Sequence, residues 1–349
     1  MTPSRYRSGL AVALLAAGLA HQALAQEGEA PSAAEREAIR ERIQSLEAEL
    51  EGLRDQLEVA APDPAPYPLP AAALEEEELE ESVAKRRLLE AESDRNPFAI
   101  TTHRRNYLLP LTYTTSPNHD AFRAINGEVD PDRLEMKFQF SAKFNLMDDL
   151  ILGNGDLFFG YTQRSWWQAY NADASSPFRE TNFEPEVFLD FENDWSLAGW
   201  TNIHNRISFN HQSNGRSDPL SRSWNRVIGT STFINDDWAV SLSPHWRIPE
   251  DESQDDNPDI HKYMGYGDVT VARRLFGDQE ASLLWRGNPG SGHMGAQLDY
   301  SWPLFGKIRG HVQYYHGYGD SLIDYDNSVQ RLGVGFSLNP LFSTGTFAP

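Results

Sequence analysis

Between about residue 100 and residue 339, apolar and polar residues alternate with a period of two. Residues 134–144 show the pattern most clearly, because six apolar side chains alternate there with Glu135, Lys137, Gln139, Ser141 and Lys143. Successive side chains of a β-strand point to opposite faces, so each such segment predicts a strand with one apolar and one polar face. Roughly twelve of these segments follow one another, separated by turn signals such as Asn154-Gly155. The sequence predicts an all-β fold built from antiparallel strands.

The polar faces distinguish a membrane barrel from a soluble sandwich. A sandwich buries its apolar faces in a shared core, whereas an outer-membrane barrel turns them to lipid and keeps a polar interior. Charged side chains on the long strands favour the barrel, because a lumen can satisfy them: Lys137, Lys143, His204 and Arg206. Tryptophans near the predicted strand ends add modest support as interfacial girdles: Trp166, Trp167, Trp195, Trp200, Trp246, Trp285 and Trp302. We therefore expect a transmembrane β-barrel over residues 100–342.

The chain before the barrel divides into three parts. Residues 1–25 have the pattern of a signal peptide, with early arginines, an apolar run and Ala23-Leu24-Ala25 as the cleavage site. Residues 26–60 carry a heptad seam that predicts a short coiled coil or a lone amphipathic helix: Ile39, Ile43, Leu46, Leu50, Leu53 and Leu57. Residues 61–99 are proline-rich and then acidic, which predicts a linker. Residues 343–349 form a C-terminal extension beyond the barrel. We expect export from the cytoplasm, with the arm of residues 26–60 in the periplasm.

Composition excludes several classes of function. The 349 residues contain no cysteine, which rules out disulfides, thiol catalysis and cysteine-based metal sites. Acidic side chains outnumber basic ones 51 to 30, giving a net charge of −21. A nucleic-acid partner is therefore not expected, because such proteins present basic surfaces.

One polar segment, residues 210–226, has the residue types of a serine hydrolase site. His211 and Ser213 are two residues apart, so on a strand they lie on the same side, and His211 can serve as the base for Ser213. Asn225 can hold the other ring nitrogen if the chain turns and returns on the adjacent strand, and backbone N–H groups near Gly215 can contribute to an oxyanion hole. Spacing alone equally allows His211 and Ser213 to be polar neighbours without a catalytic role.

Strand parity places this pair on the outside of the barrel. His211 and Ser213 share the parity of Ile203, Ile207 and Phe209, and the residues of the other parity in this strand are all polar, so they face the lumen. A nucleophile on the outer wall near the membrane boundary meets its substrate laterally from the bilayer. Such a site suits a lipid ester better than a soluble substrate.

Five motifs in order resemble the outer-membrane phospholipase A family. They lie at residues 163–168, 175–188, 210–226, 255–266 and 317–325, and the similarity spans about residues 95–342. The resemblance implies a twelve-stranded barrel that hydrolyses phospholipid acyl esters with calcium and acts as a homodimer. It also implies phospholipase A1, phospholipase A2 and lysophospholipase activity in the outer membrane of a Gram-negative bacterium.

The resemblance also implies roles for individual residues. Ser213 would be the nucleophile, His211 the base and Asn225 the orienting residue. Calcium would bind the carbonyl of Arg216, the hydroxyl of Ser221 and, from the partner subunit, Ser175, and a calcium-bound water would complete the oxyanion hole. Asp218 and Asp256 match calcium positions of the monomer, and Gln163 matches a buried amide in the dimer interface. From parity alone, Gln163 can equally face the lumen.

Two other functions fit parts of the sequence. One is a barrel without catalytic activity, a porin or structural anchor whose coiled-coil arm binds a periplasmic partner. The other is a soluble secreted lipase with a β-sandwich fold. Our hypothesis is the calcium-dependent phospholipase, with substrate entering from the outer leaflet and dimerisation completing the site.

Overall fold

The structure is a computed structural model that describes residues 79, 86, 87, 100–151, 153–251, 253 and 255–343. Contacts divide the chain into two units, Met1–Ala73 and Leu74–Pro349, and all the described residues belong to the second. The predicted signal peptide and heptad helix lie outside the described residues, as do residues 344–349 of the extension. Among the described residues, no helix is long and apolar enough to cross a membrane.

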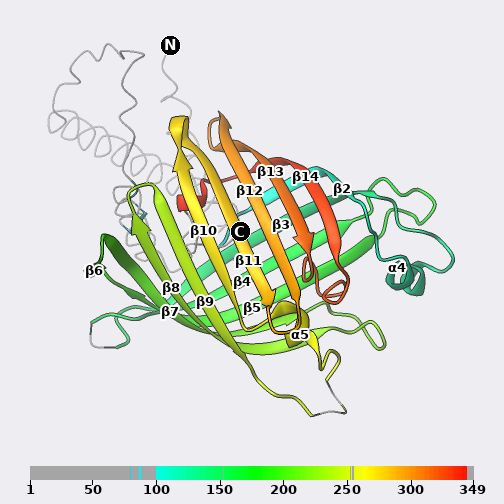
Figure 1. Ribbon diagram of the computed structural model, residues 1–349, viewed down its shortest axis with the longest axis horizontal. Coiled ribbons are helices and arrows are strands. Elements are labelled where there is room, and N and C mark those ends of the chain that lie inside the picture. Colours follow the sequence, from blue (N-terminus) through cyan, green and yellow to red (C-terminus); the bar gives the residue numbers. More distant parts are fainter. Residues whose placement is uncertain are drawn as a thin grey trace, which may run out of the picture. The chain divides into compact units, whose positions relative to one another are not determined.

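Twelve long antiparallel strands form a closed barrel in which each strand pairs with its neighbours in sequence (Figure 1). They are β2 (Tyr107–Thr114), β3 (Leu134–Met147), β4 (Asp156–Trp167), β5 (Phe178–Glu192), β7 (Trp200–Ser213), β8 (Ser223–Asn235), β9 (Trp238–Arg247), β10 (Gly267–Leu275), β11 (Gln279–Asn288), β12 (His293–Phe305), β13 (Ile308–Gly317) and β14 (Val329–Ser337). Pairing of β14 with β2 and of β3 with β4 completes the ring. The predicted fold is confirmed.

Two short strands, two helices and two 3-10 turns lie outside the twelve long strands. The two-residue strands β1 (Thr101–Thr102) and β6 (Ser196–Leu197) pair with β3 and β7, respectively. The helices are α4 (His119–Asn126) and α5 (Ile260–Met264), with 3-10 turns η1 (Phe276–Asp278) and η2 (Leu341–Ser343).

The strand connections differ at the two ends of the barrel. At one end, which we call the short-turn end, β8 joins β9 and β12 joins β13 through two residues each. At the other, the long-loop end, lie the connections before β3, β5, β8, β10 and β14, which include α4 and α5. Outer-membrane barrels have this asymmetry, with short periplasmic turns and longer extracellular loops.

The alternation of the sequence becomes an apolar outer wall and a polar lumen. On β3, Phe140 is 55% exposed whereas Lys137 is fully buried. Lys137 donates to Gln313 at 2.7 Å and pairs with Asp320 at 3.0 Å, so its charge is satisfied inside the barrel. His204 and Arg206, predicted to face the lumen, are buried beside Asp190.

The prediction that Trp166 belongs to an interfacial aromatic girdle is wrong. This side chain is fully buried, and the ammonium of Lys137 lies 5.2 Å from its ring centroid. Its cross-strand partners are Lys137 and Glu180, both in the lumen, so Trp166 also points inward. Trp195, by contrast, is exposed on the outside.

The connection between β13 and β14, residues 318–328, folds into the lumen at the long-loop end. Asp320 reaches Lys137, and the backbone N–H of Leu322 donates to Asn182 Oδ1 at 3.0 Å. The N–H of Ile323 donates to a carboxylate oxygen inside the barrel at 3.1 Å. We call residues 318–328 the lumen loop.

Three residues of the predicted linker, Leu79, Arg86 and Arg87, are helical. Arg87 donates to the carbonyls of Asn193 and Ile203 at 2.9 and 2.6 Å, beside the turn between β5 and β7. Leu79 is buried in an apolar cluster that continues the lumen face of the strands: Ile203, Ile234, Ala239, Ala272, Leu341 and Phe342. Leu79 and η2 thus occupy part of the lumen at the short-turn end, and the lumen loop occupies part of it at the other end.

Candidate active site on the outer wall

Strands β7 and β8 bring together the histidine and asparagine predicted from the sequence. His211 and Asn225 are direct cross-strand partners, and His211 Nδ1 lies 2.9 Å from Asn225 Oδ1. Because an amide oxygen only accepts, Nδ1 carries the proton and donates. The other ring nitrogen, Nε2, then keeps its lone pair and can act as a base.

A third residue sets the orientation of the asparagine amide. Asn225 Nδ2 donates to Glu250 Oε1 at 2.9 Å. Glu250 follows β9 by three residues, and the N–H of Ile248 donates to the Asn225 carbonyl at 2.8 Å, which holds this stretch beside β8. Sequence analysis missed Glu250, because no local pattern links it to residues 210–226.

Ser213 lies on the same face of β7 as His211, on the outer wall. Ile207 and Phe209 are more than half exposed on this face, whereas Asn210 is fully buried on the lumen side. The structure therefore has the predicted parity from His204 to Ser213, whereas Ile203, predicted to face outward, is buried on the lumen side because the register shifts between Asn202 and His204. Ser213 continues an apolar, outward-facing surface at the long-loop end, which is where a membrane boundary lies.

The loop after Ser213 is organised by Asn214. Its side-chain Oδ1 accepts from the N–H of Arg222 at 3.0 Å and of Arg216 at 3.3 Å, and Nδ2 donates to the Leu220 carbonyl at 2.9 Å. Gly215 has a φ of +65°, which favours glycine. A Cβ there would lie 3.1 Å from the Phe183 ring. We call residues 214–222 the site loop.

Two of the predicted calcium residues are in direct contact. The Ser221 hydroxyl donates to Asp256 Oδ2 at 2.5 Å. Neighbouring Asn257 accepts from the N–H of Ser223 at 2.9 Å, so the chain before α5 is held against the start of β8. Hydroxyl, carboxylate and backbone carbonyl oxygens are the donors that calcium prefers, so this set fits the ion.

The other predicted calcium residues are more dispersed. Arg216 is held by its guanidinium, which donates to the Arg179 carbonyl at 2.8 Å, and Asp218 is exposed at the tip of the site loop. Ser175 lies in the separate connection between β4 and β5, with a φ of 58°. Within the part of the chain that the structure describes, no three His, Cys, Asp or Glu side chains form a metal-binding group.

Gln163 faces outward, which parity alone left open. Its cross-strand partners on β3 and β5 are Phe140 and Phe183, and Phe140 is exposed on the outer wall. The amide accepts from Tyr161 Oη at 3.2 Å and donates to Ser165 Oγ at 3.3 Å.

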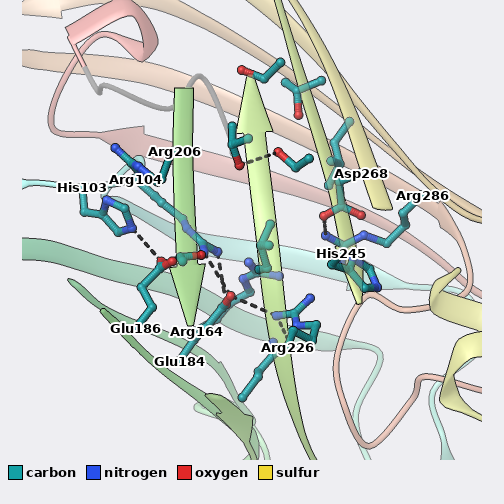
Figure 2. Close-up of a pocket in the computed structure, with 18 residues that line it drawn as sticks. His103, Arg104, Arg164, Glu184, Glu186, Arg206, Arg226, His245, Asp268 and Arg286 are labelled. Carbon is teal, nitrogen blue, oxygen red and sulfur yellow. Dashed lines mark hydrogen bonds and ion pairs between the residues drawn. The ribbon is translucent and has the colours of Figure 1, made fainter. Parts of the chain in front are cut away.

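Behind this wall, the lumen contains a cavity of about 80 Å³ lined mainly by charged and polar side chains (Figure 2). Glu184 and Glu186 accept from Arg104 at 3.0 Å each, and Arg226 reaches Glu184 at 3.2 Å. His103 pairs with Glu186 at 2.7 Å. These pairs link the segment before β2 to β5 and β5 to β8, so the charged groups around the cavity connect strands from inside the barrel.

Comparison with known proteins of similar sequence shows the family of this chain. A family model described as Phospholipase A1 matches residues 83–338. The phospholipase A1 of Klebsiella pneumoniae is 43% identical over 247 residues, covering 71% of this chain and 85% of that protein. The phospholipase A1 of Escherichia coli K12 is 42% identical over 247 residues, covering 71% of this chain and 84% of that protein. This chain belongs to the phospholipase A1 family.

Solved structures of phospholipase A relatives have the same barrel. The Salmonella typhi outer membrane phospholipase dimer with bound calcium superposes with a TM-score of 0.67 at 41% identity, covering 70% of this chain and 94% of that one. Outer membrane phospholipase A from Escherichia coli gives the same TM-score and identity, covering 70% of this chain and all of the other. As a phospholipase A1 family member, the chain is a Gram-negative outer-membrane barrel that hydrolyses phospholipids.

Proposed function

We propose that this chain is a calcium-dependent serine phospholipase that acts as a homodimer at the outer face of its barrel. The observation that carries the proposal is the hydrogen bond from His211 Nδ1 to Asn225 Oδ1, two residues from Ser213 on the apolar outer wall. This arrangement supplies a base and its orienting group beside a hydroxyl that faces lipid. The family assignment supplies the substrate class.

In the proposed reaction, Ser213 Oγ attacks the acyl carbonyl carbon while His211 Nε2 takes the hydroxyl proton. The tetrahedral oxyanion then collapses, the ester C–O bond breaks, and His211 returns the proton to the departing alcohol oxygen. Water hydrolyses the acyl-enzyme by the same two transfers. Asn225 Oδ1 holds the Nδ1–H through both steps, which keeps the ring in the productive tautomer and stabilises the imidazolium.

Calcium would be held by the Arg216 carbonyl, the Ser221 hydroxyl and Ser175 of the partner subunit, whereas Asp218 and Asp256 would hold calcium in the monomer. When bound, the ion would supply positive charge that stabilises the oxyanion. Gly215, two residues after Ser213, has a positive φ that lets the backbone turn there, and backbone N–H groups near it would contribute to the oxyanion hole. Calcium in the Salmonella typhi dimer supports this assignment.

The same scaffold supports activity on several acyl esters. An outer-wall site binds substrate from the bilayer rather than within the lumen, so the two acyl positions of a phospholipid and the single chain of a lysophospholipid can all reach Ser213. We therefore propose phospholipase A1, phospholipase A2 and lysophospholipase activity.

Ser213→Ala tests the proposal directly. The purified full-length protein and this variant are assayed for fatty-acid release from phospholipid micelles, with calcium and with EDTA. We expect the variant to lose at least about a thousandfold in kcat, because the nucleophile is gone, and EDTA to inactivate the wild type. Equal fatty-acid release by both proteins would contradict the proposal that Ser213 is the nucleophile. Release by the wild type that is insensitive to EDTA would contradict the proposed calcium requirement.

A further inference from the structure

The hydrogen-bond chain of the site continues beyond Asn225. Asn225 Oδ1 accepts from His211, and Nδ2 of the same amide donates to Glu250 Oε1, with both distances 2.9 Å. We propose that Glu250 is a positioning residue for this reaction, acting on His211 through the Asn225 amide. The proposal rests on the hydrolase mechanism above and adds a fourth member to the Ser213, His211 and Asn225 series.

The first effect of Glu250 is on orientation. An asparagine amide has an oxygen and a nitrogen of nearly equal size, so it can rotate by half a turn with little steric change. Reversed, it would present N–H donors to His211 Nδ1–H and could not hold that proton. A carboxylate only accepts, so Glu250 selects the rotamer in which Nδ2 faces Glu250 and Oδ1 faces His211.

The second effect is electrostatic. Asn225 is neutral, so it adds no negative charge behind the imidazolium that forms when His211 takes the proton. Glu250 places a carboxylate one residue further along the same chain of hydrogen bonds. A hydrogen bond to a charged acceptor is stronger than one between neutral groups, and linked hydrogen bonds polarise one another, which makes Oδ1 a better acceptor.

The backbone places Glu250 independently of the side-chain contact. The N–H of Ile248 donates to the Asn225 carbonyl at 2.8 Å, continuing the pairing of Arg226 with Arg247 beyond the end of β9. Pro249 fixes φ between Ile248 and Glu250 and so limits the paths that the chain can take. Glu250 is partly buried, which strengthens its interaction with the amide relative to an exposed ion.

Three substitutions separate the two effects. Glu250→Ala removes both the acceptor and the charge, and we expect kcat on phospholipid micelles to fall roughly tenfold with KM nearly unchanged, since Glu250 acts on the proton transfer rather than on substrate binding. Glu250→Gln keeps an acceptor and removes the charge, so it should lose less. Asp251→Asn is the matched control, because it removes one charge at the next, exposed position and should leave kcat unchanged.

A double-mutant cycle with Asn225→Ala shows whether Glu250 works through the amide. In the Asn225→Ala background, Glu250→Ala should cause no further loss of kcat. An unchanged kcat for Glu250→Ala, an equal loss in both backgrounds, or a loss confined to KM would each overturn the inference. These outcomes are distinct from failure of the proposed function, which appears as Ser213→Ala retaining activity.

Discussion

At the scale of the residue, the proposed site depends on the backbone conformation next to Ser213. Gly215 has a positive φ, and its Cα hydrogen faces the Phe183 ring. We expect Gly215→Ala to strain the site loop by about 1 kcal/mol and to lower kcat, because a left-handed backbone and a contact of 3.1 Å both oppose the new methyl. Steady-state kinetics on micelles and a thermal unfolding midpoint measure the two effects.

Gly127→Ala is the control for Gly215→Ala. Gly127 ends α4 with a φ of +73°, but a Cβ there meets nothing within 4 Å. Its φ of +73° and ψ of −147° also disfavour alanine, so the unfolding midpoint should fall at least as far while kcat is kept. If both variants kept full activity, the conformation of the site loop would not matter for catalysis.

At the scale of the element, the lumen loop is held by buried charges. Burial alone would raise the pKa of the Asp320 carboxyl, but Arg331 and Lys137 outweigh burial and hold that pKa well below its usual range. Asp320→Asn leaves two cations with less compensation, and we expect it to cost about 3 kcal/mol of unfolding free energy. Urea unfolding in detergent, followed by tryptophan fluorescence, measures the change.

Asp326→Asn makes the same chemical change in the same loop. Asp326 is exposed, so its substitution should shift the urea midpoint only slightly. A shift as large as that of Asp320→Asn would mean that the loop responds to its net charge rather than to the specific pairs with Lys137 and Arg331.

At the scale of the whole molecule, the proposed dimer places outer walls together. An amide in hydrocarbon is unfavourable alone and favourable when paired across an interface, typically by about 1 kcal/mol. We therefore expect Gln163→Ala to weaken calcium-dependent dimerisation severalfold in analytical ultracentrifugation. Gln330→Ala is the control, because Gln330 is exposed on the outer wall at β14, three strands around the ring from β4. Equal effects of the two substitutions would mean that Gln163 does not lie in the dimer interface.

The sequence predicts the barrel well because alternation is local. The alternation within a strand predicts which of its side chains face the lumen and which face outward, as in β3 and β7. The position of His211 beside Asn225 follows from one turn between adjacent strands. Trp166 is assigned wrongly because its orientation depends on pairing with Lys137 rather than on residue type. Glu250 could not be predicted, because its contact with Asn225 depends on the path of a non-repetitive segment after β9.

The bracing of the lumen has a consequence for how much the site must rearrange during a turnover. Directly behind His211 and Asn225, Arg226 donates to Asn210 at 2.7 Å and Trp224 donates to Gln212 at 2.9 Å, tying β7 to β8 from the inside. Side chains supported in this way are preorganised for the transition state. In the proposed mechanism, the fluid bilayer would therefore supply a mobile substrate to residues that are already in place, and the reorganisation energy of the protein would stay small.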